Sequence, residues 1–376
     1  MGQNPSLSTT AIALVIIALI VGATIGYFVA PKGILQEDFV ALQSENVDLK
    51  AQIASLTSPK KIGLILATGG LGDKSFNDLS YEGVQRAQDE LGIEFDFVQP
   101  TAIAEYESLQ RNFAASGEYE LIVCVGFDQK DAVNIVAGEY PNQNFVLIDE
   151  VSNRTNVASL TTKANEGAFL VGVIAASVTD TGIIGFVGGM DIPLIRDFYV
   201  GYEAGALWLS DELSFDVTVL SPFFVGGWGD PSTGREVALG IIDLDADVIF
   251  VAAGGSGLGA LQACDDTGIW GIGVDASQGY LNDAIIASAT KRVDISIYDQ
   301  IVKELLGTFE GKWISGGLAE GWAGCDRLPD EETFWEAFFE FDYDPDRTLH
   351  PDIVFWIEIA RFGIISGAIV VPSGFT

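Results

Sequence analysis

The feature that most constrains this 376-residue chain is an alternation of strand and helix patterns, which begins near residue 61 and starts again near residue 181. Short apolar runs that end in glycine or polar turns are typical of buried strands, and the amphipathic stretches between them are typical of helices. Such alternation predicts parallel βαβ units. Because the pattern occurs twice in a similar order, we expect an α/β protein whose two open lobes face each other across a cleft. A cleft between domains is the usual place for a small-molecule site.

The expected elements follow from this reading. In the first half we expect strands at residues 62–67, 94–98, 121–125 and 145–148, a strand or a hinge at 157–160, and helices after residue 77, at 104–115, up to 136 and at 166–177. In the second half we expect strands at 181–189, 217–220, 248–252 and 271–274, and helices at 195–209 and 233–239. Residues 353–371 should form a final helix and strand, because the uncharged run after Arg361 is too short to span a membrane.

Charge and composition exclude several classes of function. The chain has 19 basic and 53 acidic residues, a net charge of -34, which would repel nucleic-acid phosphates. Cys124, Cys264 and Cys325 are far apart and form no CxxC motif, so no metal or disulfide framework is expected. His350 is the only histidine, which argues against histidine triads and histidine metal clusters. We therefore expect no metal and no nucleic-acid partner, and the histidine count disfavours many hydrolases. The further expectations of no enzyme activity and no cofactor depend on the family resemblance given below.

The first 58 residues differ from the rest. Residues 11–30 carry no charge and are long enough to cross a bilayer as a helix, so residues 1–33 are predicted to be an uncleaved membrane anchor. Residues 34–58 follow as a stalk, and residues 60–376 as the binding domain. No Lys or Arg precedes the apolar span whereas Lys32 and Lys50 follow it, which on charge alone weakly favours an internal globular part.

The stalk has a seven-residue repeat. Leucines recur every seven residues, and the first three are each followed four residues later by Phe39, Asn46 or Ile53. A polar Asn at such a position is typical of two-stranded coiled coils, so a homodimer through the stalk is possible. A single amphipathic helix is the alternative, since about three heptads are marginal alone. The repeated residues are Leu35, Leu42, Leu49 and Leu56.

A glycine-rich turn at residues 69–83 connects the first expected strand to its helix and carries Phe76 and Asn77. In an open parallel sheet such a turn lies at the carboxyl end of a strand, where ligands bind. An aromatic ring beside an amide that both donates and accepts suits a flat heterocycle. The alternative is a capping turn, in which Asp73 or Asn77 starts the helix and Phe76 packs in the core.

Three further features lie in the second half. The glycine turn at 254–259, with Asp275 after it, is similar to a dinucleotide-binding pattern, but its spacing differs and a plain tight turn is the alternative. Asp275 could accept two hydrogen bonds from a vicinal diol such as a ribose, or could cap a helix. Trp228 lies in a glycine-rich loop, where closure of the lobes could place a planar base between it and Phe76. Lys291 could bond a hydroxyl, although such a lysine is more often solvated.

Together these motifs resemble the basic membrane protein (BMP) family, nucleoside-binding substrate-binding proteins of ABC importers. The resemblance covers residues 61–372 and leaves out the anchor and stalk. The segments that carry it are residues 72–77, 82–83, 185–189, 201–205, 229–231, 234–236, 253–259, 272–275 and 291–294.

The resemblance implies a type I periplasmic-binding-protein fold, in which the chain crosses between the lobes three times. It places lobe 1 at about residues 60–162 and 288–318 and lobe 2 at about 163–287 and 319–376. It implies that Phe76 stacks on the base and that Trp228 is the opposing aromatic, where relatives usually have Phe. Asn77 and Asp149 would hydrogen-bond the base. Asp275 and Lys291 would bind the ribose hydroxyls, with the backbone of Gly254 and Gly255 nearby.

The chain departs from the family pattern in two ways. Relatives usually carry an Asp at the position of Ala67, where it would meet the sugar, so the 5′ side of the ligand lacks its usual partner unless Thr68 substitutes. The lipid-bearing cysteine is also missing, and the membrane helix replaces it as the tether. A tether of this kind implies lobes on the outside of the membrane, against the charge count.

These inferences lead to one main hypothesis and two rivals. The main hypothesis is an extracellular, membrane-anchored receptor that captures nucleosides, with purines favoured, and delivers them to an ABC permease. The first rival is a membrane-tethered sensor that passes lobe closure through the stalk to a partner protein. The second is a dinucleotide-dependent enzyme, which the glycine turn near Asp275 suggests but which no clear acid–base pair supports.

Overall fold

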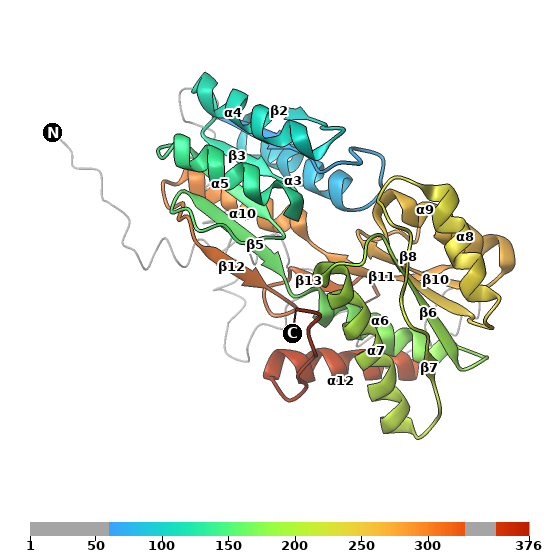
Figure 1. Cartoon of the computed structure of the whole chain (residues 1–376). Helices are drawn as coiled ribbons and strands as arrows, with labels where there is room; N and C mark the ends of the chain where they lie inside the picture. Colours follow the sequence, from blue (N-terminus) through green and yellow to red (C-terminus); the bar gives the residue numbers. More distant parts are fainter. Residues whose placement is uncertain (1–59, 328–350, 376) are drawn as a thin grey trace.

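The computed structural model describes residues 60–327 and 351–375 (Figure 1). The predicted anchor at 1–33 and the predicted stalk at 34–58 lie outside these ranges. In the part of the chain that is described, no helix combines the length and the apolar character needed to cross a bilayer.

The first lobe is built on a six-stranded parallel sheet with the strand order β12-β5-β4-β3-β1-β2. The strands are β1 (Lys61–Ile65), β2 (Glu94–Val98), β3 (Leu121–Cys124), β4 (Asn144–Ile148), β5 (Val157–Thr162) and β12 (Trp313–Gly316). The helices are α3 (Phe76–Leu91), η1 (Ile103–Glu105), α4 (Tyr106–Ser116), η2 (Phe127–Gln129), α5 (Lys130–Glu139) and α10 (Val293–Leu305).

The second lobe has a seven-stranded sheet with the order β13-β11-β10-β9-β6-β7, in which β8 also pairs with β6 and β13 runs antiparallel to β11. The strands are β6 (Ile183–Gly188), β7 (Thr218–Val219), β8 (Phe223–Phe224), β9 (Val248–Ala252), β10 (Trp270–Asp275), β11 (Ile285–Lys291) and β13 (Ala323–Cys325). The helices are α6 (Ala164–Val178), α7 (Pro193–Leu213), α8 (Pro231–Ile242), η3 (Gly254–Ser256), α9 (Gly257–Thr267) and α12 (Pro351–Ser366).

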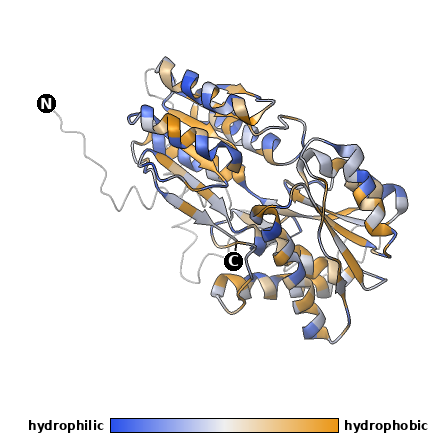
Figure 2. Ribbon diagram, in the orientation of Figure 1, coloured by the Kyte–Doolittle hydropathy of each residue, from blue (hydrophilic) through white to orange (hydrophobic). Residues whose placement is uncertain are grey.

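Helices cover both faces of each sheet, which explains why the strands are apolar without alternation. In β1, Ile62 and Leu64 join the core under α3 and α10, whereas the next residue, Ile65, joins the core under α4 and α5. The second sheet likewise has one core under α6, α7 and α12 and another under α8 and α9. Figure 2 shows the resulting apolar strands between helices of mixed polarity.

The chain changes sheet three times: after β5, between β11 and β12, and before β13. This is the connectivity that the family resemblance implies. Because β11 stays in the second sheet up to Lys291, we propose that the lobe boundary expected near residue 288 lies just after this lysine. The other proposed boundaries, near residues 162 and 318, fall in connections between elements of different sheets.

Two glycines permit close packing of α6 against α7. A Cβ atom on Gly205 would lie 2.0 Å from the carbonyl oxygen of Phe169, and one on Gly172 would lie 2.1 Å from that of Tyr202. Both distances are far below van der Waals contact, so the backbones approach as closely as they do only because these side chains are absent. This explains part of the glycine pattern at residues 201–205 that carries the family resemblance.

The C-terminal segment differs from its prediction. The helix is present as α12, but residues 367–371 form no strand. Gly367 ends the helix with a φ of 77°, and the backbone that follows is bound by side chains instead of a sheet. Asn165 Nδ2 donates to the carbonyl of Pro372 at 2.9 Å, and the N–H of Gly374 donates to Asp197 Oδ1 at 3.0 Å.

Candidate functional site

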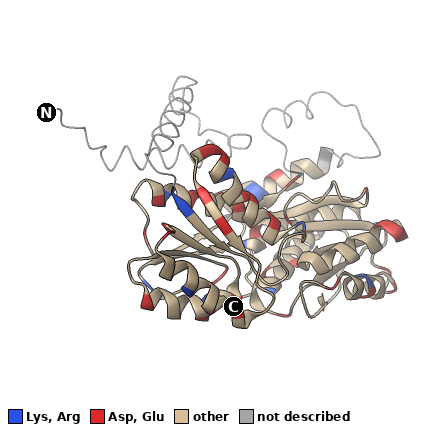
Figure 3. Ribbon diagram, turned by 90° about the horizontal axis from the view of Figure 1, so that it is seen from above, with Lys and Arg blue, Asp and Glu red and all other residues tan. Residues whose placement is uncertain are grey.

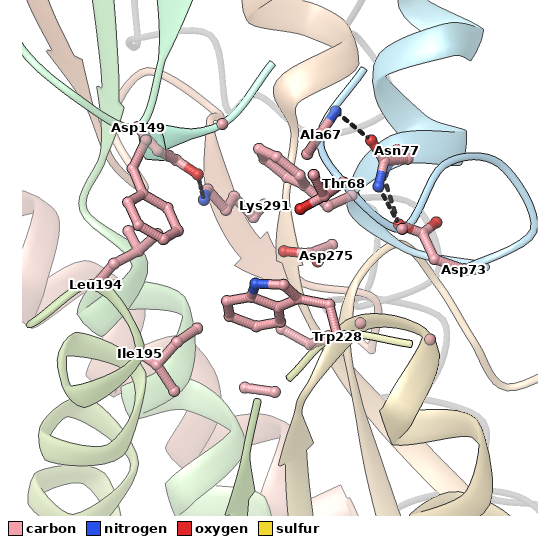
Figure 4. Close-up of a pocket in the computed structure, with 18 of the residues that line it drawn as sticks. Ala67, Thr68, Asp73, Asn77, Asp149, Leu194, Ile195, Trp228, Asp275 and Lys291 are labelled. Carbon is pink, nitrogen blue, oxygen red and sulfur yellow. Dashed lines mark hydrogen bonds and ion pairs between the residues drawn. The ribbon is translucent and has the colours of Figure 1, made fainter. Parts of the chain in front are cut away.

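A cavity lies between the two lobes, and its empty space, including open solvent, is about 710 Å³. Its walls come from the carboxyl ends of parallel strands in both sheets, where an open α/β sheet binds ligands. Figure 4 shows side chains from both lobes converging on it. The structure brings together every site residue that the sequence predicts: Phe76, Asn77, Asp149, Trp228, Gly254, Gly255, Asp275 and Lys291 all line this cavity.

The turn between β1 and α3 is organised by Asp73. Its carboxylate accepts hydrogen bonds from the backbone N–H groups of Ser75, Asn77 and Asp78 at 3.0, 2.8 and 3.2 Å, and so caps the first turn of α3. Burial raises the pKa of Asp73 above its ordinary value, and the backbone bonds oppose that rise. The capping alternative is therefore correct for Asp73, and it coexists with a place for Phe76 in the cavity wall.

The Asn77 side chain is held at both ends by the protein. Its Oδ1 accepts from the N–H of Ala67 at 2.9 Å, and its Nδ2 donates to Asp73 at 3.1 Å. The residue is 4% exposed. One amide hydrogen and the second lone pair of Oδ1 remain for a ligand, so Asn77 could still present one donor and one acceptor to a base.

Lys291 and Asp149 form a buried ion pair across the cleft. Lys291 Nζ lies 2.5 Å from Asp149 Oδ2, and each side chain is 3% exposed. The same Nζ lies 4.8 Å from the centre of the Phe76 ring, within the range of a cation–π contact. The second oxygen of Asp149, Oδ1, is buried and has no hydrogen-bond partner among the described residues. That oxygen can accept a bond from a ligand.

Asp275 ends β10 in a left-handed conformation, with a φ of 63°, and Asp149 follows β4 with a φ of 68°. Asp and Asn are the non-glycine residues that tolerate this region best. Asp275 Oδ2 accepts from the hydroxyl of Ser75, in the opposite lobe. Burial raises the pKa of Asp275 to about 6, although Lys291 and the Ser75 hydroxyl both oppose the rise.

Trp228 enters the cavity from the loop before α8 (Figure 4). Its indole fills the space beside Gly189, where a Cβ atom would lie 2.2 Å from the ring. Its carbonyl accepts from the N–H of Ser256 at 2.9 Å. A Cβ on Gly255 would lie 3.0 Å from the same carbonyl oxygen, and Gly254 has a φ of 53°. The glycines thus allow the strand end to approach the tryptophan loop closely.

Three bonds join the lobes around the cavity. In addition to the Lys291–Asp149 pair and the Ser75–Asp275 bond, Gln278 Nε2 donates to the carbonyl of Lys74 at 2.9 Å. Each bond connects a loop of the first lobe to a strand end or loop of the second. The two lobes are therefore in a closed position around the cavity.

Some lining residues were not predicted from the sequence. Leu194, Ile195 and Phe198, at the start of α7, form an apolar wall. Asp73 and Asp128 add polar groups from the first lobe, as does Thr68, which the sequence already suggests as a substitute partner for the sugar. In the sequence, the three apolar residues cannot be distinguished from the core-facing residues of an ordinary amphipathic helix. Asp128 lies three residues beyond the expected strand at 121–125, and this position near a strand end was the one signal that could have identified it.

The charge of the cavity limits what it can hold. Its lining contains the carboxyl groups of Asp73, Asp128, Asp149 and Asp275 and the ammonium of Lys291. Acidic residues outnumber basic ones in the whole chain, 53 to 19, and they are spread along the ribbon of both lobes (Figure 3). An excess of buried carboxylates repels anions and offers acceptors to hydroxyl and N–H donors. The site therefore suits an uncharged ligand with several donors and a flat apolar part.

Comparisons with known proteins show which family and which solved structures this chain resembles. A sequence model of the Bmp family, described as ABC transporter substrate-binding protein PnrA-like, matches residues 60–334. An uncharacterized lipoprotein of Pyrococcus abyssi is 36% identical over 308 residues, which cover 78% of this chain and 75% of that protein. Basic membrane protein A of Borreliella burgdorferi is 32% identical over 303 residues, or 78% of this chain and 87% of its own.

Solved structures agree with the sequence matches. A solute-binding protein of an ABC transporter system from Aeropyrum pernix K1 superposes with a TM-score of 0.74 at 32% identity, over 84% of this chain and 94% of that one. An ABC-transporter solute-binding protein from Conexibacter woesei has a TM-score of 0.65 at 21% identity, over 84% of this chain and all of that one, and shares the fold. The two-lobed α/β fold is thus that of periplasmic binding proteins.

Proposed function

Because the chain belongs to the Bmp family of PnrA-like ABC transporter substrate-binding proteins, we propose that its cleft captures a nucleoside, with a purine favoured. Members of this family bind ligands and are not enzymes, and a permease is the partner of such a protein. The observation that carries the proposal is the meeting, in one closed cleft, of two aromatic side chains with Asp275 and the Lys291–Asp149 pair.

Each group in the cleft matches one part of a nucleoside. Phe76 and Trp228 offer faces for a planar base, and each such contact contributes about 0.5–1.5 kcal/mol beyond area burial. The unpartnered Oδ1 of Asp149 can accept an N–H of the base. Asp275 can accept both hydroxyls of a ribose diol, and Lys291 can donate to one of them. A phosphorylated ligand would meet the excess of carboxylates, so we expect nucleotides to bind far more weakly.

We also propose how the protein is attached. Residues 11–30 would cross the membrane as an anchor and residues 34–58 would form a stalk, which leaves the two lobes outside the cell. The names of two relatives, a lipoprotein and a basic membrane protein, support a membrane-associated extracellular place for the lobes. A coiled-coil homodimer through the stalk remains part of this proposal.

The proposal is tested by calorimetric titration of the full chain, in detergent, with inosine, guanosine, adenosine, uridine, the free bases, ribose, NAD and simple sugars. Binding of one or more nucleosides at micromolar or lower Kd, with weaker binding of bases and ribose, is the expected result. Binding of sugars or NAD alone would leave the family and fold intact but would refute the nucleoside assignment.

Replacing Trp228 with alanine should weaken nucleoside binding by about 10- to 100-fold, because one stacking face and its buried area are lost. Trp270→Ala is the matched control, since Trp270 is 42% exposed and lies at the start of β10, away from the cavity. Calorimetry of both variants measures the effect. Equal affinities for the two variants would remove Trp228 from the site.

A further inference from the structure

Asp128 has an oxygen atom for which the described residues offer no hydrogen-bond partner. The residue lies in η2, shortly after β3, and lines the cavity. Its Oδ1 is buried and makes no hydrogen bond with any described residue. A buried acceptor without a partner is unfavourable, so such an atom in a ligand cleft points to a donor that the ligand supplies.

The other oxygen of Asp128 is fixed by Tyr106. The Tyr106 hydroxyl donates to Asp128 Oδ2 at 3.1 Å and accepts from the backbone N–H of Thr68 at 2.9 Å. Tyr106 is fully buried, so its ring is held by the core. The single hydroxyl proton is committed to Oδ2, and this arrangement leaves Oδ1 to the cavity.

The unpartnered oxygen lies beside Ala67. Gly126 separates the two, with a φ of 111°. A Cβ atom on Gly126 would lie 3.1 Å from Asp128 Oδ1, 3.3 Å from Ala67 Cβ and 4.0 Å from the ring of Phe76. Asp128 and Ala67 thus border the same spot of the cavity wall, next to the ring on which the proposed base stacks.

We propose that Asp128 Oδ1 accepts a hydrogen bond from the 5′-hydroxyl of the nucleoside, in the place left open by the methyl group of Ala67. This inference rests on the proposed function. Asp275 and Lys291 are assigned to the ribose diol and Asp149 to the base, which leaves Thr68 and Asp128 as polar candidates for the 5′-hydroxyl. Of these two, Asp128 is the one with a buried acceptor that no described residue satisfies. Asp128 supplies that acceptor. Tyr106 acts as a positioning residue that aims the carboxylate.

The assignment predicts a loss that is specific to one hydroxyl. In the unaltered protein, the 5′-deoxynucleoside should bind about 10- to 100-fold more weakly than its parent, since bonds to charged acceptors are among the stronger ones. Asp128→Asn keeps the size of the side chain but removes the charge, so this difference should shrink to about threefold or less. Asp131→Asn, an exposed change on α5, is the matched control and should keep the full difference.

A relocated carboxylate provides a second arm. The double variant Ala67→Asp with Asp128→Asn should regain a 5′-hydroxyl dependence of about tenfold, because the acceptor returns to the same spot from the neighbouring strand end. The probes are one nucleoside, its 2′-, 3′- and 5′-deoxy forms and its 5′-monophosphate, all measured by calorimetry on the full chain. Far-ultraviolet circular dichroism verifies that each variant is folded.

The outcomes separate the two proposals. If the unaltered protein binds the nucleoside and its 5′-deoxy form equally, the role of Asp128 is refuted while the nucleoside function stands. That measurement needs no variant. Equal weakening of parent and 5′-deoxy ligand by Asp128→Asn would also refute it, since a purely structural role predicts that pattern. If no nucleoside binds at all, the proposed function fails first.

Discussion

Replacing Lys291 with methionine is expected to weaken nucleoside binding by more than about 100-fold and to destabilise the fold by about 3 kcal/mol. The ammonium lies 2.5 Å from Asp149 with both side chains 3% exposed, so its removal leaves a buried carboxylate without its counter-charge. Methionine retains most of the side-chain length but neither the charge nor the contact with the Phe76 ring. Calorimetry measures the first effect and urea unfolding the second.

Two controls define this result. Lys312→Met makes the same change at a side chain that is 58% exposed and should alter neither property appreciably. Adding Asp149→Asn to Lys291→Met removes the unpaired charge and should restore much of the stability without restoring affinity. A Lys291→Met protein as stable and as tight-binding as the Lys312 variant would contradict the importance of the pair.

Replacing Asp275 with asparagine should remove most of the preference for a nucleoside over its free base. The carboxylate that accepts both hydroxyls of the diol becomes an amide with one acceptor oxygen, so nucleoside affinity should fall by about 100-fold. Affinity for the free base should change by about threefold or less. Parallel titrations with inosine and hypoxanthine measure both, and equal losses for the two ligands would refute the ribose role.

The same residue predicts a pH dependence of the empty protein. Burial in the closed cleft raises the pKa of Asp275 from 3.8 to about 6, and opening would hydrate it and return the pKa toward the lower value. Closure therefore takes up a proton. The stabilisation of the closed form is fully present below about pH 4 and is lost as the pH rises through 6. Small-angle scattering should show a larger radius at pH 7 than at pH 4.5, and Asp275→Asn should reduce this difference.

Much of the fold could be predicted from the sequence because the strands are short, apolar and separated by helices. β2 and β9 begin and end where the pattern indicates. The sequence does not predict β8, because a strand of two residues is too short to show an apolar periodicity. The strand expected after α12 was wrong because the backbone that follows this helix hydrogen-bonds to the side chains of Asn165 on α6 and Asp197 on α7.

Site residues could be predicted where a chemically distinctive side chain stands at the end of an expected strand or in a glycine-rich loop. Asp275 and Lys291 stand at the ends of apolar strands, and Trp228 stands out in a glycine-rich loop. Phe198 could not be identified, because an apolar residue near the start of a helix carries no mark of facing a cleft. The double engagement of Asn77 also depends on a bond to the backbone of Ala67, which only the folded turn creates.

The threefold crossing between the sheets has a consequence for the order in which the protein can assemble during synthesis. The first sheet lacks its edge strand β12, and α3 lacks its neighbour α10, until residues 293–316 have been made. Gly83 on α3 is shaped for that contact, since a Cβ there would lie 2.7 Å from the carbonyl oxygen of Asp294. At ~5–20 residues per second, the apolar face of α3 waits on the order of ten seconds for its cover. The early-made half of this chain must therefore be sheltered or remain unfolded while the later half is translated.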